Sequence, residues 1–147
     1  MKKWIALSLL LLVGLALLAA CGQSATSVAE VGGRRVAVDG GAYRQLTASQ
    51  LQAMLEAKDF VLVNVHIPFA GNIPGTDLAI PFNEVSRRAD LLPKDKQAKI
   101  IVYCRSGAMS AVAARTLVAM GYTNVWDLAG GMNAWQRAGF SLEQDRP

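Results

Sequence analysis

Hydrophobic residues in this chain fall into short continuous runs separated by polar and turn-forming segments. Three runs, at residues 60–65, 100–103 and 125–128, consist almost entirely of β-branched, aliphatic and aromatic residues. Runs of this kind are typical of strands that are buried on both faces of a sheet. Two shorter runs, Tyr43–Leu46 and Leu78–Ile80, are further strand candidates.

A second periodicity, with apolar residues three or four positions apart, predicts helices between these runs. Thr47 and Gln50 have the spacing of a capping box, and Leu51, Met54 and Leu55 form the apolar stripe of the helix that follows. The remaining helices are expected at Glu84–Leu92, at Ser110–Met120 and from Gly130-Gly131 to Ala138.

The alternation of strands and helices predicts a single α/β domain at residues 42–143. Uniformly apolar strands indicate a central parallel sheet of about five strands with helices on both faces. The length of this segment suits one hydrophobic core and not two.

The first twenty residues have the pattern of a secretory signal peptide, with a positive start at Met1–Lys3 and an apolar run at Trp4–Ala20. Seventeen apolar residues are close to the lower limit for spanning a bilayer, so an uncleaved anchor is the alternative. The ending Leu18-Ala19-Ala20-Cys21 resembles the bacterial lipobox. That resemblance implies removal of residues 1–20 and acylation of Cys21 with fatty-acid chains such as palmitate.

Residues 21–41 are mostly small and polar, and we expect a flexible tether. Two alternatives remain for Arg34-Arg35 and the neighbouring Val36 and Val38: a loose strand, or a contact with anionic lipid head groups. A lipidated Cys21 would hold the domain outside the cytoplasm on the cell membrane. Because Gly22 and not Asp follows this cysteine, a source with two membranes could place it on the outer membrane.

Charge and cysteine content narrow the possible functions. Without the leader, which contains Lys2 and Lys3, the formal charge falls from +4 to +2, too mild to indicate a nucleic-acid-binding surface. The two cysteines, Cys21 and Cys104, stand in unrelated contexts, so a disulfide between them is not expected. Neither belongs to a Cys/His cluster, and the sequence predicts no metal and no cofactor.

The segment Cys104–Ser110 joins a buried strand to a helix at the carboxyl edge of the sheet, where open α/β folds bind ligands. Unpaired backbone N–H groups and the positive end of the following helix favour the thiolate of Cys104. Gly107 permits the tight curvature of such a loop. The alternative, a structural cysteine that packs as a small hydrophobe, does not account for the Gly- and Ser-containing turn after it.

Three blocks of the sequence together resemble the single-domain rhodanese-like sulfurtransferase family. YCRSGAMS at 103–110 is similar to the family's active-site loop, NVHIPFAGNIPGT at 64–76 to its Gly-x-Ile-Pro-Gly turn, and LAGGMNAW at 128–135 to its Gly-Gly-x-x-x-Trp helix. The blocks occur in the family's order and spacing, and the resemblance covers about residues 43–142. It implies a three-layer rhodanese-like fold and transfer of sulfane sulfur through a persulfide on Cys104.

The resemblance also implies substrates and the residues that bind them. The donor would be thiosulfate, a polysulfide or a persulfide, and the acceptor a thiol or cyanide, whereas no protein partner can be named. The residues that would bind the persulfide or substrate are those of the loop: Arg105, Ser106, Gly107, Ala108, Met109 and Ser110.

One residue of the loop departs from the family's pattern. Many members have an arginine five positions after the cysteine, where it helps to hold an anionic donor, but Met109 stands here. The next position is Ser110, so the pattern of related phosphatases, with arginine six positions after the cysteine, is also absent. The missing cation puts thiosulfate in doubt and leaves Arg105 and Arg115 as candidate anion contacts.

His66, the single histidine, ends the strand expected beside the Cys104 strand, and we predict it at the rim of the pocket. A Cys/His nucleophile–base pair is the alternative, although the backbone already activates the thiol.

The function expected from the resemblance is that of an enzyme, a sulfurtransferase or persulfide carrier. A catalytically weak rhodanese-like binding module, which Met109 favours, and a redox-sensing thiol remain open.

Overall fold

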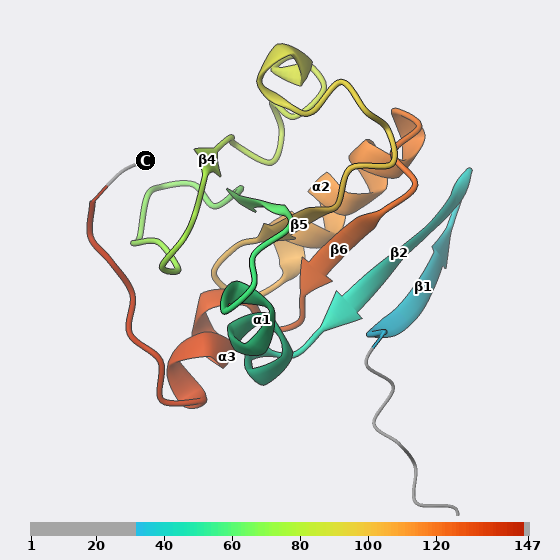
Figure 1. Cartoon of the computed structure of the whole chain (residues 1–147). Coiled ribbons are helices and arrows are strands. Elements are labelled where there is room, and N and C mark those ends of the chain that lie inside the picture. Colours follow the sequence, from blue (N-terminus) through green and yellow to red (C-terminus); the bar gives the residue numbers. More distant parts are fainter. Residues whose placement is uncertain (1–31, 146–147) are drawn as a thin grey trace, which may run out of the picture.

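The computed structural model describes residues 32–145, which form one mixed sheet with helices on both sides (Figure 1). The strands are β1 (Arg34–Val38), β2 (Gly41–Leu46), β3 (Val61–Asn64), β4 (Leu78–Ala79), β5 (Ile100–Tyr103) and β6 (Val125–Leu128). The helices are α1 (Ala48–Leu55), the short 3-10 helix η1 (Ala89–Leu91), α2 (Ala108–Ala119) and α3 (Gly131–Arg137). The expected signal peptide and Cys21 lie outside the described residues. Within residues 32–145, no helix has the length and hydropathy needed to cross a membrane.

The sheet has the strand order β1-β2-β6-β5-β3-β4. The five strands from β2 to β4 pair in parallel, as expected, and β1 adds a sixth strand antiparallel to β2. Every residue of β5 and β6 is buried. The continuous apolar runs at 100–103 and 125–128 are therefore central strands, as their sequence predicts.

The helices divide between the two faces of the sheet, which gives the expected three-layer α/β architecture (Figure 1). On one face, α2 packs Ala113, Ala114 and Leu117 into a cluster that also contains Cys104. On the other face, Leu51 from α1 and Met132 and Trp135 from α3 form a second cluster. Each helix contributes one apolar face to a core layer, and the sheet separates the two layers.

The N-terminal part of the domain differs from the expectation of a tether that extends to residue 41. Residues 34–38 form β1, whose register with β2 runs from Arg34 opposite Gln45 to Val38 opposite Gly41. For residues 34–38, the strand that the sequence left open as an alternative is therefore correct. The turn between β1 and β2 consists of Asp39-Gly40, a dipeptide typical of two-residue β-hairpin loops. Gly40 has φ 82°.

The expected helix at Glu84–Leu92 is wrong. The segment is a series of turns with a 3-10 helix at only Ala89–Leu91. Its buried apolar residues are Val85 and Leu92, and the positions between them are exposed. Two anchors seven positions apart bury too little apolar surface to stabilise a regular amphipathic helix.

The capping box at the start of α1 is present as predicted. The Gln50 backbone N–H donates to Thr47 Oγ1 at 3.3 Å, and the Thr47 backbone N–H donates to Gln50 Oε1 at 2.8 Å. These bonds satisfy donors that the first turn of a helix leaves unpaired.

We expect Thr47→Ala to lower the free energy of unfolding by about 1 kcal/mol, because the first turn of α1 loses its cap. Urea denaturation followed by circular dichroism measures the change. Ser49→Ala, at an exposed position in the same turn, is the control and should leave stability nearly unchanged or slightly raised. Equal effects of the two substitutions would contradict a capping role for Thr47.

Candidate active site

Cys104 directly follows β5, one of the central strands, and begins the loop that leads into α2. It is 1% exposed and belongs to the core cluster on the α2 face. The backbone N–H of Gly107 donates to Cys104 Sγ at 3.1 Å. A backbone N–H aimed at the sulfur stabilises negative charge on it.

The loop curves back on the sulfur because of Gly107, which has φ 98° and is the N-cap of α2. The first residue of α2 is Ala108, two positions before the expected start, and the first hydrogen bond of the helix joins Ala111 N to Gly107 O. No side chain caps this end of the helix. The N–H groups of the first turn therefore remain available beside the sulfur, together with the positive end of the helix dipole.

The remaining loop residues differ in exposure. Arg105, Ser106 and Ala108 are exposed, whereas Ser110 is fully buried and donates from Oγ to Gly107 O at 3.2 Å. Met109 is half-buried and packs against the core cluster that contains Cys104. The position five residues after the cysteine is thus part of the apolar packing around the loop.

The start of α3 holds the backbone of this loop from the other side. Met132 N donates to Cys104 O, and Asn133 N donates to Arg105 O, both at 2.9 Å. Gly131 approaches so closely that a Cβ there would overlap the Cys104 carbonyl oxygen and lie 2.9 Å from the Arg105 carbonyl carbon. The sequence indicated Gly130-Gly131 as the start of the last helix and as part of a family motif, and the structure adds the steric reason for Gly131.

His66 lies at the same edge of the sheet, just beyond β3, which pairs directly with β5. Burial lowers the pKa of His66, and the charge of Arg105 lowers it further. The two side chains are therefore close enough to interact, and His66 is neutral at neutral pH. Its Nδ1 is buried and has no hydrogen-bond partner within the described part of the chain.

A buried polar network that the sequence analysis did not identify supports this edge. Asn64 Nδ2 donates to Gly71 O at 3.0 Å and to Asn72 Oδ1 at 2.8 Å, and Tyr103 Oη donates to the same Asn72 oxygen at 3.2 Å. Burial raises the pKa of Tyr103 to about 12, so its hydroxyl stays neutral. The signal in the sequence was a single polar residue, Asn64, within the apolar run at residues 60–65.

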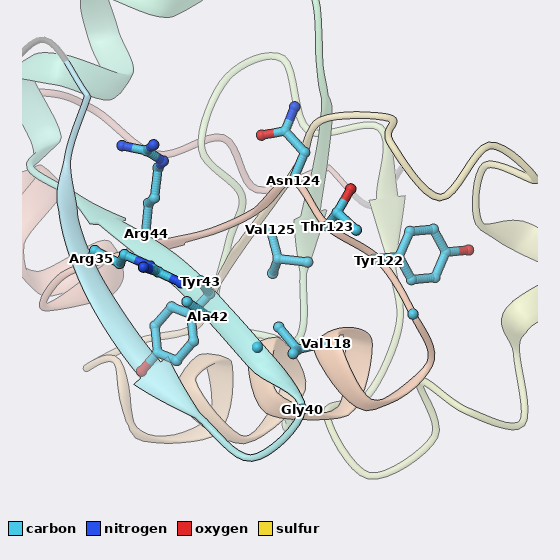
Figure 2. Close-up of a pocket in the computed structure, with 12 residues that line it drawn as sticks. Arg35, Gly40, Ala42, Tyr43, Arg44, Val118, Tyr122, Thr123, Asn124 and Val125 are labelled. Carbon is cyan, nitrogen blue, oxygen red and sulfur yellow. The ribbon is translucent and has the colours of Figure 1, made fainter.

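Two cavities are associated with different ends of the sheet. One of about 230 Å³ adjoins the loop and is lined by Ala70, Arg105, Met132, Asn133, Gln136, Leu142 and Gln144. The other, of about 450 Å³, lies between the amino-terminal halves of β2 and β6 and the end of α2, and Figure 2 shows its lining. None of the site residues expected from the sequence lines this larger cavity, which is at the end of the parallel strands remote from Cys104.

The described residues contain no group of three or more His, Cys, Asp or Glu side chains that could hold a metal ion. Arg115, the second candidate anion contact, is exposed and donates from Nη1 to Ala111 O at 3.2 Å. Of the site residues expected from the sequence, the fold brings together Cys104, the loop after it, which includes Arg105, and His66.

Comparison with known proteins relates this arrangement to one family. A family model described as a rhodanese-like domain matches residues 47–138. A sulfurtransferase from Allochromatium vinosum is 35% identical over 94 residues, which cover 62% of this chain and 85% of that protein. The thiosulfate sulfurtransferase GlpE of Pseudoalteromonas translucida is 28% identical over 100 residues, with 66% and 92% of the two chains covered.

A similar fold occurs among solved structures. The crystal structure of a rhodanese-related protein from Thermoplasma volcanium matches with a TM-score of 0.60 and 27% identity. The match covers 70% of this chain and 100% of that one.

We expect Gly131→Ala to destabilise the protein more than Gly139→Ala does. Both glycines have positive φ, but a Cβ at Gly139 meets nothing within 4 Å. Gly139→Ala should therefore cost only the ~1–2 kcal/mol of the left-handed backbone, and Gly131→Ala a further ~1–3 kcal/mol of overpacking. Urea denaturation of both variants measures the difference. Equal losses of stability would contradict the close approach of Gly131 to the Cys104 loop.

Proposed function

Because the chain belongs to the rhodanese-like domain family, we propose that it is a sulfurtransferase or persulfide carrier that moves sulfane sulfur through a persulfide on Cys104. The relatives named as sulfurtransferases support this class of function. The observation that carries the proposal is the hydrogen bond from Gly107 N to Cys104 Sγ, made beside the uncapped start of α2.

The chemistry requires two displacements at sulfur. In the first, the Cys104 thiolate attacks the sulfane sulfur of a donor, an S–S bond in the donor breaks, and a Cys104 persulfide anion forms. With thiosulfate as donor, the leaving group is sulfite. In the second, a thiolate or cyanide attacks the terminal sulfur of the persulfide and releases the Cys104 thiolate. The N–H groups of the loop stabilise the anionic sulfur in each resting state.

The donor that best suits this site has less negative charge than thiosulfate. Met109 is packed among apolar residues and offers no cation, and His66 is neutral at neutral pH. Arg105 is then the charged side chain of the loop itself. A polysulfide, an alkyl persulfide or a thiol-bearing partner would need fewer cationic contacts than a dianion does.

The location that we propose is the extracytoplasmic face of a membrane, with acyl chains on Cys21 as the anchor. Its support is the signal-like segment at 1–20 and the lipobox-like ending at Cys21. This arrangement assigns lipid attachment to one cysteine and sulfur chemistry to the other.

A second candidate is a catalytically weak module that binds a partner or senses oxidants through Cys104. Met109, in place of the arginine of many rhodaneses, is the observation that favours it. Such a module would form a reversible sulfenic acid with peroxide but would not pass sulfur to an acceptor.

We expect the full-length protein in detergent to gain one sulfur atom on Cys104 when incubated with polysulfide, and less completely with thiosulfate. Intact-protein mass spectrometry detects the gain, and cyanide should remove it as thiocyanate. Cys104→Ser should abolish the adduct, whereas Cys21→Ser, the matched control, should retain it. If neither polysulfide nor thiosulfate gave an adduct, sulfur transfer would be contradicted and the binding or sensing module would be the remaining candidate.

We expect Met109→Arg to raise kcat/KM for thiosulfate about tenfold, the equivalent of one added charge-assisted hydrogen bond. Release of sulfite measures the rate. Ala119→Arg places the same charge at the exposed far end of α2 and should have little effect. A similar change in both variants would mean that net charge, and not a cation in the loop, limits the use of thiosulfate.

A further inference from the structure

The cavity of about 450 Å³ beside β2 and β6 has no part in the sulfur chemistry described above. Its volume lies within the range of sites that bind small organic molecules, and it is far above the ~30 Å³ that one water molecule occupies. The cavity lies where two neighbouring parallel strands separate: the ladder between β2 and β6 begins at Arg44 and Trp126, although β2 itself begins at Gly41.

The separation of the two strands leaves backbone groups directed at the cavity. Leu46 O accepts from Ala129 N at 3.0 Å, so Leu46 directs its backbone groups to the β6 side, and by alternation Ala42 does the same. The next pair of this ladder would be Tyr43 and Val125, and the register does not extend to it. The N–H groups of Ala42 and Val125, which both line the cavity, therefore have no partner in the ladder between β2 and β6.

The charge of the cavity is positive. Among the described residues, its lining includes two arginines and no aspartate or glutamate (Figure 2). Arg35 of β1 lies directly opposite Arg44 of β2, so the two side chains share a face of the hairpin with their Cβ atoms about 5 Å apart. Like charges at such positions destabilise a sheet, and no salt bridge among residues 32–145 involves either arginine. The hairpin thus brings an uncompensated pair of cations to the cavity.

Arg44 is fixed by two contacts. Its Nη1 donates to Gly32 O at 2.7 Å, and its guanidinium carbon lies 5.4 Å from the centroid of the Trp126 ring. A guanidinium has five N–H donors, and the Gly32 carbonyl takes one of them. On the opposite wall, Lys96 Nζ lies 3.8 Å from the centroid of the Tyr122 ring, which adds a third cation beside the cavity. The positive charge is therefore partly ordered before any ligand binds, which lowers the entropic cost of binding.

These features determine the class of ligand. Guanidinium and backbone N–H groups only donate hydrogen bonds, so the ligand must carry acceptors and negative charge. A carboxylate has two oxygens in one plane, and one guanidinium can take both of them. A terminal phosphate has three free oxygens in a tetrahedral arrangement, so two neighbouring guanidiniums can bind it together. The space beside the small residues Gly40, Gly41 and Ala42 is left for an organic group attached to the phosphate.

We propose that the cavity beside β2 and β6 binds an organic molecule through its terminal phosphate group, which Arg35 and Arg44 hold from the hairpin. The phosphate comes from one of two sources, a soluble phosphate ester or the head group of a lipid. The cavity is remote from Cys104, so the proposal does not depend on sulfur transfer. A bound phosphate would neutralise the two opposed arginines, which have no counter-charge among the described residues.

The test is isothermal titration calorimetry of glycerol 3-phosphate with the full-length protein in detergent. We expect binding to one site, and we expect Arg35→Gln to raise Kd about tenfold, the equivalent of one charge-assisted hydrogen bond. Arg35→Lys keeps the charge but loses the planar fork, so its Kd should lie between those of the wild type and Arg35→Gln. Arg35 is the residue to replace because Arg44 also contacts Trp126.

Arg34→Gln is the matched control. Arg34 precedes Arg35 in β1, is not part of the cavity lining, and donates to Gln45 Oε1 on the other face of the hairpin. Its replacement removes the same charge and should leave Kd nearly unchanged, as should Cys104→Ser. Equal weakening by Arg34→Gln and Arg35→Gln would mean that the general surface charge attracts the ligand. That result, or no binding by the wild type, would overturn the proposal.

A second readout is thermal unfolding with and without the ligand. Without glycerol 3-phosphate, Arg35→Gln should be at least as stable as the wild type, because it relieves the repulsion between opposed like charges. Saturating glycerol 3-phosphate should raise the Tm of the wild type and leave that of the variant nearly unchanged. If Arg35→Gln were the less stable protein without ligand, Arg35 would have a structural role, contrary to the proposal.

Two further ligands distinguish the sources of the phosphate. Dihexanoyl phosphatidate has the same terminal phosphate with two short acyl chains. If its Arg35-dependent binding were tighter than that of glycerol 3-phosphate, the site would take a lipid head group, and equal or weaker binding would indicate a soluble ester. Both results support the phosphate site. Inorganic phosphate that bound as tightly as glycerol 3-phosphate would contradict the proposal that the cavity holds an organic molecule.

Discussion

The N–H groups of Met132 and Asn133 donate to the carbonyl oxygens of Cys104 and Arg105, and these two hydrogen bonds tie the loop after β5 to the start of α3. The approach of Gly131 to the Cys104 carbonyl leaves no room for a side chain. With its carbonyl groups held from the α3 side, the loop can turn its N–H groups towards the sulfur on the α2 side. The curvature of the loop, the uncapped start of α2 and the burial of Cys104 all depend on this contact.

Polar groups support the site from both faces of the sheet. On the face of α1 and α3, the Tyr103 hydroxyl contacts Asn72 and Ile73 N, which holds the segment that follows His66. On the face of α2, Ser110 donates to Gly107 O, and the buried Asp127 accepts from Gln45. Tyr103 directly precedes Cys104, and Asp127 lies on the strand beside that of Tyr103. Buried polar groups in otherwise apolar layers therefore gather around one short stretch of backbone, where their hydrogen bonds limit its freedom to move.

The charge around the loop comes mainly from the backbone. Met109 contributes apolar packing, His66 is neutral at neutral pH, and Arg105 is exposed to solvent, where its field is screened. Aligned N–H groups stabilise a singly charged sulfur well, because they act over a short distance in a buried position. A doubly charged ligand would need further cations, which is the reason that the proposed donor carries less charge than thiosulfate.

The sequence by itself determined the central strands, the capped first helix, the α/β class and the position of Cys104, because continuous apolar runs and local caps depend on near neighbours in the chain. It left residues 34–38 open and was wrong about a helix at 84–92, since a strand needs a partner and a helix needs a core to cover. Only the tertiary structure decided that Gly131 touches the Cys104 carbonyl, that Arg105 acts on His66, and that Gln45 donates a hydrogen bond to Asp127. These contacts join residues far apart in the chain, and their distances depend on how the strands pair, which no local pattern records.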